Sequence, residues 1–154
     1  MKCHLNIQVG EAFEGRLDRS KLGGVVRRAL ELEGLEGAVE LSLLIADDDT
    51  LRHLNREYRS QDKTTDVLSF SFLDGGLKKE PFINPPDGVL HLGQVVISYP
   101  QAVRQAGQSR KSVSSVIETL LAHGVLHILG YDHKKRVDAE KMRARGAEIL
   151  RERI

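Results

Sequence analysis

The sequence contains no tryptophan, only one cysteine, and no apolar run long enough to span a membrane. A single thiol, Cys3, cannot form an internal disulfide, so the chain relies on a packed core and suits a reducing compartment. Its first residues, Met-Lys-Cys-His-Leu-Asn, do not resemble a secretory signal. We therefore expect a cytoplasmic protein with no membrane partner.

The net charge is also close to zero, because the 23 Lys and Arg residues are nearly balanced by 22 Asp and Glu residues, which leaves a formal charge of +1. Such a balance gives no overall attraction to nucleic acid, so RNA contact would require a local cluster of basic side chains. The length of 154 residues suits one domain over residues 1–154, large enough to bury a core. We see no repeat, linker or low-complexity segment.

The hydrophobic pattern predicts an α+β domain built on one four-stranded mixed sheet. Strands are expected at residues 3–9, 39–46, 66–72 and 89–97. Helices are expected at about 20–34, 47–58, a short stretch after 98, about 112–129, and 134–153. The first two strands flank a helix and should be parallel, whereas the third and fourth should be antiparallel.

Two further segments carry local signals. Asp47, with two more aspartates after it, is expected to cap a helix rather than to bind a metal. Residues 73–88 contain three glycines and three prolines. Long loops of this kind are commonly functional or mobile, so we expect this one to lie beside the site and to gate substrate.

The candidate metal-binding residues lie in one stretch, His123-Gly-Val-Leu-His127-Ile-Leu-Gly130-Tyr-Asp-His133. Residues four apart share a helix face, so His123 and His127 can reach one ion. A turn at Gly130 can return His133 to the same ion. Three imidazoles favour one Zn²⁺ per chain and leave a fourth position for water, as in catalytic sites. The alternative is that these histidines are ordinary polar side chains, partly buried or in a loop.

The helix that carries the first two histidines is mostly apolar and should be a central, metal-binding helix packed on several sides. Its polar residues recur at intervals of four as Ser115, Thr119, His123 and His127. Buried imidazoles need partners, and a metal supplies them.

Three blocks resemble the bacterial YbeY family of zinc-dependent endoribonucleases and rRNA maturation factors. They lie at 54–70, which contains Tyr58-Arg59 and a later Thr-Asp-Val-Leu-Ser-Phe, at 92–98, and at 123–133. The resemblance implies a single-strand-specific endoribonuclease that acts in rRNA maturation and ribosome quality control in the cytoplasm. It also implies ribosomal RNA, the small ribosomal subunit and its assembly factors as partners.

The family pattern matches at the zinc ligands His123, His127 and His133 and at Arg59, and these four are the candidate catalytic residues. The Arg59 guanidinium could bind a phosphate. The alternative is a solvated charge at a helix end. Basic neighbours, Arg52, Arg56 and Lys63, make this segment the most basic cluster before the histidines.

Other polar residues are weaker candidates. Asp66 and Asp132 could orient imidazole N–H groups, or could equally stabilise a strand end and a turn. Gln94 and Ser71 depart from an aspartate and a proline that are usual in the family. The first departure should remove a carboxylate near the cleft, and the second should affect only strand stiffness. The three remaining histidines, His4, His53 and His91, are interpreted as non-ligands.

Two other functions remain open. The histidine spacing is also the skeleton of zinc metallopeptidases, so we expect a zincin-like local site. Those enzymes carry a glutamate general base directly after the first histidine, where this sequence has Gly124. Glu118 lies on a different face of the helix and is a poor substitute. The other alternative is a non-catalytic, zinc-stabilised ribosome-associated factor.

Overall fold

The computed structural model describes residues 1–73, 88–132 and 134–151. In these ranges the chain forms four strands and five α-helices, as the sequence predicts. The strands are β1 (Lys2–Val9), β2 (Ala38–Ala46), β3 (Val67–Ser71) and β4 (Val89–Ser98). The helices are α1 (Arg19–Leu32), α2 (Asp48–Arg59), α3 (Tyr99–Ser109), α4 (Val113–Ile128) and α5 (Arg136–Arg151), with a short 3-10 turn at Glu11–Phe13.

The strands form one mixed sheet in the order β1-β2-β4-β3. β1 pairs parallel with β2, because α1 returns the chain to the end of the sheet where β1 begins. β2 pairs parallel with β4, because α2 and the oppositely directed β3 lie between them in the chain. β3 pairs antiparallel with β4, as predicted, and is an edge strand of the sheet. The loop expected at 73–88 falls almost wholly on 74–87, outside the described residues, so the gating role stays a prediction.

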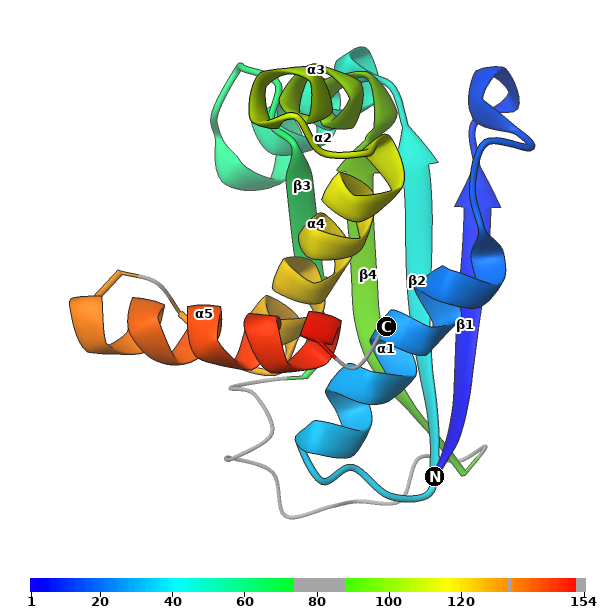
Figure 1. Cartoon of the computed structure of the whole chain (residues 1–154), viewed down its shortest axis with the longest axis vertical. Helices are drawn as coiled ribbons and strands as arrows, with labels where there is room; N and C mark the ends of the chain where they lie inside the picture. The colour runs from blue at the N-terminus through cyan, green and yellow to red at the C-terminus, as the bar shows by residue number, and fades with distance from the viewer. Residues whose placement is uncertain (74–87, 133, 152–154) are drawn as a thin grey trace.

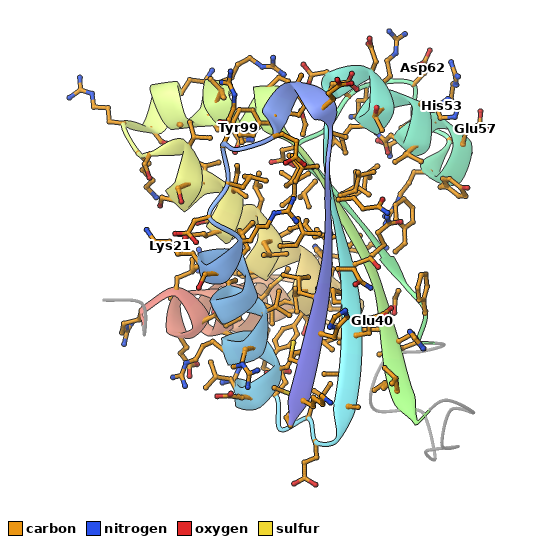
Figure 2. The ribbon with its side chains drawn as sticks, turned by 90° about the vertical axis from the view of Figure 1, so that its right-hand side faces the viewer. Lys21, Glu40, His53, Glu57, Asp62 and Tyr99 are labelled. Carbon is orange, nitrogen blue, oxygen red and sulfur yellow. The ribbon has the colours of Figure 1, made fainter. Side chains whose placement is uncertain are left out.

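Helices cover the two faces of the sheet unequally. α1, α4 and α5 lie on one side, while α2 covers only one end of the other side (Figures 1 and 2). The larger core contains the inward residues of β2 and the apolar face of α4. A smaller cluster beneath α2 contains Leu51, Leu68 and Val96. No other described helix covers the rest of that second face, which we call the open face, and Glu40 points outward from it (Figure 2).

The central helix is α4, which packs on α1, α3, α5, β3 and β4. Most of its residues are buried, and apart from Val113 and Ser114 in the first turn its predicted polar stripe is the part that stays accessible: Thr119 is exposed, and Ser115, His123 and His127 are half-buried. The stripe prediction is therefore confirmed. No helix among the described residues is long and apolar enough to cross a membrane.

Polar caps fix where the helices begin. The carboxylates of Asp18 and Asp47 accept bonds from backbone N–H groups in the first turns of α1 and α2, at 3.1 and 2.9 Å. The hydroxyls of Ser98 and Ser112 do the same for α3 and α4. These contacts satisfy N–H groups that have no partner within the helix. The predicted capping role of Asp47 is confirmed.

The amphipathic pattern of α5 predicts burial of Ala139, Met142, Ala147, Ile149 and Leu150, and this prediction is right only in part. Met142 and Ile149, seven residues apart on one face, are buried. Ala147, predicted to be buried, is exposed. It lies nearly opposite Ile149 around the helix, and only one face of α5 meets α4 and α1.

Candidate active site

A cleft of about 650 Å³ opens between the end of α2, the edge strand β3 and the C-terminal half of α4. It brings together three of the four candidate residues, because Arg59, His123 and His127 all line it. The fourth, His133, lies outside the described residues. The cleft therefore combines two imidazoles and a guanidinium from elements far apart in the sequence.

The two described histidines meet as the helical spacing predicts. The Nε2 atoms of His123 and His127 are 3.0 Å apart, and their rings meet edge to face with centroids 4.5 Å apart. Two nitrogens bound to one tetrahedral zinc at about 2.0–2.1 Å would stand about 3.3 Å apart. The pair thus has nearly the spacing of two ligands of one ion.

The end of α4 fixes the orientation of His127. Gly130 has a φ of 106°, which favours glycine, and its N–H bonds to the carbonyl of His127 at 3.1 Å. The N–H of Tyr131 bonds to the carbonyl of Leu126 at 2.9 Å. Together these bonds form a Schellman motif, so the stop predicted at Gly130 is confirmed.

This turn places the Tyr131 carbonyl 3.1 Å from Nδ1 of His127. A carbonyl can only accept, so Nδ1 carries the proton, and Nε2 of the neutral ring keeps its lone pair toward His123. A hydrogen bond to the second nitrogen is the usual way in which proteins orient a metal-binding histidine. The chemistry of the pair therefore fits a borderline divalent ion such as zinc.

The Tyr131 side chain anchors the same turn to distant elements. Its hydroxyl donates to Glu33 at the end of α1 (2.8 Å), and Glu33 also forms an ion pair with Arg145 of α5 (2.8 Å). Burial raises the pKa of the Tyr131 hydroxyl, and the Glu33 carboxylate adds to the effect. The hydroxyl therefore stays protonated and able to donate.

Arg59 reaches the cleft from the end of α2. Its Nη2 donates to the backbone carbonyl of Ser69, on the edge of β3 that faces away from β4, at 2.8 Å. Its guanidinium lies 5.9 Å from the centre of the Phe70 ring. Within the described part of the chain no carboxylate pairs with Arg59. Its charge is therefore available to an anion in the cleft.

The basic cluster around Arg59 is weaker than its sequence suggests. Arg52 pairs with Asp62 at 2.8 Å, and Arg56 lies 3.8 Å from Glu57. Exposed pairs of this kind contribute little to stability, but they offset part of the positive potential. Lys63 lines the cleft together with Arg59.

A buried polar residue that the sequence analysis did not single out, Asn55, holds the loop at the mouth of the cleft. It is only 4% exposed, and its Nδ2 donates to the carbonyl of Lys63 at 3.0 Å. The backbone carbonyl of Asn55 accepts from the N–H groups of Ser60 and Gln61. An amide on the otherwise apolar inner face of a helix was the available signal, since buried amides bond to nearby backbone.

The two aspartates considered as imidazole partners also contact other groups, and whether either orients His133 stays a prediction. Oδ2 of Asp66, which lines the cleft, accepts from Gln105 of α3 at 2.9 Å. Oδ1 of Asp132 accepts from the N–H of Lys134 at 3.0 Å, which stabilises the turn. For His127 the partner is instead the carbonyl of Tyr131.

The expectation for Gln94 is wrong. Gln94 lies on the open face of the sheet, opposite α4, and lines a small hollow with Asn6 and Ser42. The cause is an irregularity in β4: Glu40 pairs with His91 and Leu41 with Gly93, so the residue between them is extra and shifts the alternation of faces.

The neighbouring Gly93 has a structural role. Its φ is 150°, and a Cβ there would collide with the carbonyl of Phe70 on β3. Only glycine allows the two strands to approach so closely.

Ser71 does more than alter strand stiffness. Its hydroxyl donates to the carbonyl of Ile128 at 3.1 Å and so ties the end of β3 to the last turn of α4. Proline at this position could not make that bond.

The three remaining histidines lie outside the residues that line the cleft. Nδ1 of His91 is 3.0 Å from Glu40, and Nδ1 of His53 is 3.3 Å from Arg56. Figure 2 shows His53 on α2, at the outer surface. His4 lies on β1, in register with Glu40.

Gly124 also bears on the metallopeptidase alternative. A Cβ at this position would lie 2.8 and 3.1 Å from the two methyl groups of Val95 and 3.5 Å from Val67. The direction that a side chain would take is therefore toward the sheet and not into the cleft. A glutamate here would have no room and could not reach the histidines.

A sequence profile of the family described as "Endoribonuclease YbeY" matches residues 11–153. A protein of that name from Moorella thermoacetica is 41% identical over 150 residues, which cover 97% of this chain and 96% of the relative. Another from a Roseiflexus species is 39% identical over 148 residues, with 96% and 91% covered. The solution structure of TM1509 from Thermotoga maritima matches with a TM-score of 0.60 and 21% identity, over 96% of this chain and 90% of that one. The last match shows the shared fold.

Proposed function

Because this chain belongs to the endoribonuclease YbeY family, we propose that it cleaves the phosphodiester backbone of single-stranded RNA in a metal-dependent reaction. The proposed role is the maturation of ribosomal RNA and the quality control of ribosomes in the cytoplasm. Its partners in that role would be ribosomal RNA, the small ribosomal subunit and its assembly factors.

The observation that carries the proposal is the meeting of His123, His127 and Arg59 in one cleft. Hydrolysis of a phosphodiester needs an activated water and a positive group near the phosphoryl oxygens. An imidazole pair suited to a metal and a guanidinium without a carboxylate partner among the described residues provide the parts for both requirements.

His123, His127 and His133 would hold one zinc ion. When bound, such an ion lowers the pKa of a coordinated water to roughly 7 and polarises a phosphoryl oxygen. The Tyr131 carbonyl keeps the proton of His127 on Nδ1, so that Nε2 can serve as a ligand.

Arg59 would bind the phosphate that is cleaved. A guanidinium presents a planar fork of donors that matches two phosphate oxygens. Its present partner is the carbonyl of Ser69, a neutral acceptor on the edge of the sheet. A dianionic transition state would compete strongly for the same donors, because charge builds on the phosphoryl oxygens during cleavage.

The test of the activity uses protein purified without a chelator and without a histidine tag. Metal analysis should find one equivalent of zinc per chain, and a structure with metal should show three imidazoles at about 2.0–2.1 Å from it. A single-stranded fragment of ribosomal RNA should be cleaved, and a chelator should abolish the cleavage reversibly. Metal-loaded protein that leaves every single-stranded RNA intact would refute the proposal.

Arg59→Ala tests the proposed phosphate contact, with Arg56→Ala as the matched control from the same helix. Loss of one transition-state donor should reduce turnover on the order of 10²-fold and reduce RNA binding much less. Arg56→Ala should chiefly weaken binding and flatten its salt dependence, because Arg56 is not among the residues that line the cleft. Equal losses of binding and turnover in Arg59→Ala would make Arg59 a positioning contact only.

Experiments on the wild-type and His127→Ala proteins test the two alternatives, a metallopeptidase and a non-catalytic ribosome-associated factor. Hydrolysis of peptides would favour the metallopeptidase alternative. The packing at Gly124 disfavours it, because a side chain at this position would point toward the sheet. A folded His127→Ala protein that still associates with the small ribosomal subunit, combined with a wild type that does not cleave RNA, would favour the non-catalytic factor.

A further inference from the structure

Tyr58 and Phe70 form an accessible aromatic pair beside the cleft. Tyr58, near the end of α2, is 70% exposed, and its ring meets that of Phe70 on β3 edge to face with centroids 5.4 Å apart. Phe70 is half-buried and packs on the small cluster beneath α2. The Tyr58 ring therefore lies outside the core and is accessible to a ligand.

The aromatic pair is continuous with the cleft through Arg59. The guanidinium lines the cleft, bonds to the Ser69 carbonyl, and lies 5.9 Å from the Phe70 ring. Consecutive residues of a strand point to opposite faces, so Ser69 faces the cleft while Phe70 faces the open side of the sheet. A chain bound at Arg59 can therefore pass over the edge of β3 and reach the two rings.

The open face continues beyond the rings with polar side chains. The registers of the four strands align Asn6, Ser42, Gln94 and Phe70 in one row across the sheet. The first three carry donors and acceptors and line a hollow of about 330 Å³. Glu40, the acidic side chain beside this row, is in contact with His91 at 3.0 Å.

We infer that the Tyr58–Phe70 pair is a stacking platform for an unpaired base of the RNA, one that lies next to the phosphate bound by Arg59. An aromatic ring that stacks on a base tolerates every sequence, and a neighbouring guanidinium holds the backbone. Duplex RNA has its bases stacked on one another and cannot offer a free face to the rings. The platform therefore selects single strands, and it rests on the proposed cleavage of RNA.

The absence of tryptophan from the chain makes a direct test possible. Tyr58→Trp introduces one fluorophore on the platform, and Val137→Trp introduces one at a site on α5 that is 62% exposed. Each full-length, metal-loaded protein is titrated with a short oligouridylate whose phosphorothioate linkages resist cleavage. Stacking should quench Tyr58→Trp strongly and to saturation, while Val137→Trp should change little. Quenching that is absent from both proteins or equal in both would overturn the inference.

Affinities measured with the same oligonucleotide provide a second criterion. Tyr58→Ala should weaken binding by roughly 5- to 150-fold, the range found for one aromatic–base stack, and Tyr58→Phe should stay within about twofold of wild type. A duplex of the same length should bind both proteins equally. Unchanged RNA affinity in Tyr58→Ala would overturn the platform and leave the rings as a surface for a protein partner.

The outcomes distinguish this inference from the proposed function. A wild type that cleaves RNA while Tyr58→Trp is not quenched would refute the platform alone. A wild type that never cleaves RNA while Tyr58→Trp is quenched would refute the proposed activity and leave the binding surface in place.

Discussion

Replacement of Gly124 by alanine tests how closely α4 must approach the sheet. Alanine normally stabilises the interior of a helix by about 1 kcal/mol relative to glycine. At Gly124, however, the new methyl would lie 2.8 and 3.1 Å from both methyl groups of Val95, which is fully buried. Valine is stiff about χ1, so it cannot turn both methyl groups away.

Overpacking of this kind costs about 1–3 kcal/mol, and the close contact with two methyl groups favours the upper part of that range. After the gain in helix propensity is subtracted, Gly124→Ala should lower the free energy of unfolding by about 1–2 kcal/mol. Urea unfolding, with the slope checked for two-state behaviour, measures the change.

Two controls show whether the clash is the cause. Gly24→Ala on α1 has nothing within 4 Å of the new methyl and should stabilise the protein by about 0.5–1 kcal/mol. In a Val95→Ala background the clash is gone, so Gly124→Ala should be neutral or stabilising there. If Gly124→Ala alone stabilises the protein as much as Gly24→Ala does, the argument about packing fails. The objection to a glutamate at position 124 would then fail with it.

Two further predictions concern charged and polar contacts. Burial raises the pKa of the Asp48 carboxyl, but hydrogen bonds, above all from Arg104, outweigh it, and the pKa is lowered. The ionised carboxylate therefore stabilises the fold above its ordinary pKa near 4, and this stabilisation is lost as the pH falls further. The difference in unfolding free energy between wild type and Asp48→Asn should accordingly shrink below about pH 4, and a constant difference would contradict the reasoning. Tyr131→Phe removes the hydrogen bond to Glu33 and should lower the free energy of unfolding by about 1 kcal/mol. It should also weaken zinc binding by up to about tenfold, as measured by competition with a chelator. Lower stability with unchanged zinc affinity would show that the anchor does not position His127.

The parts of the site that depend on local structure could be predicted from the sequence. The approach of His123 and His127 follows from a spacing of four on a helix, and the stop at Gly130 follows from the needs of a helix end. Both require only a few neighbouring residues. The convergence of His133 stays a prediction, because His133 lies outside the described residues.

The parts that depend on pairing between distant strands could not be predicted in the same way. The face on which Gln94 lies is reversed by one extra residue in β4. Gly93 within the strand is a local signal of an irregularity, but which residue is extra shows only in the pairing with β2. The anchoring of Tyr131 by Glu33 needs two segments almost a hundred residues apart in the chain. Asn55 had a local signal, but its partner in the loop shows only in the folded chain.

Arg59 illustrates how one residue can serve both the fold and the site. β3 is an edge strand, and an edge presents unpaired carbonyls that invite pairing with another chain. Arg59 covers one of them, at Ser69, and the same contact holds its guanidinium at the rim of the cleft. Alanine at position 59 would expose the edge as well as remove the positive charge, so a loss of activity alone is ambiguous. Lysine keeps the charge and one donor to Ser69 but loses the planar fork, so a folded Arg59→Lys protein that binds RNA and cleaves it slowly would assign the catalytic effect to the fork itself.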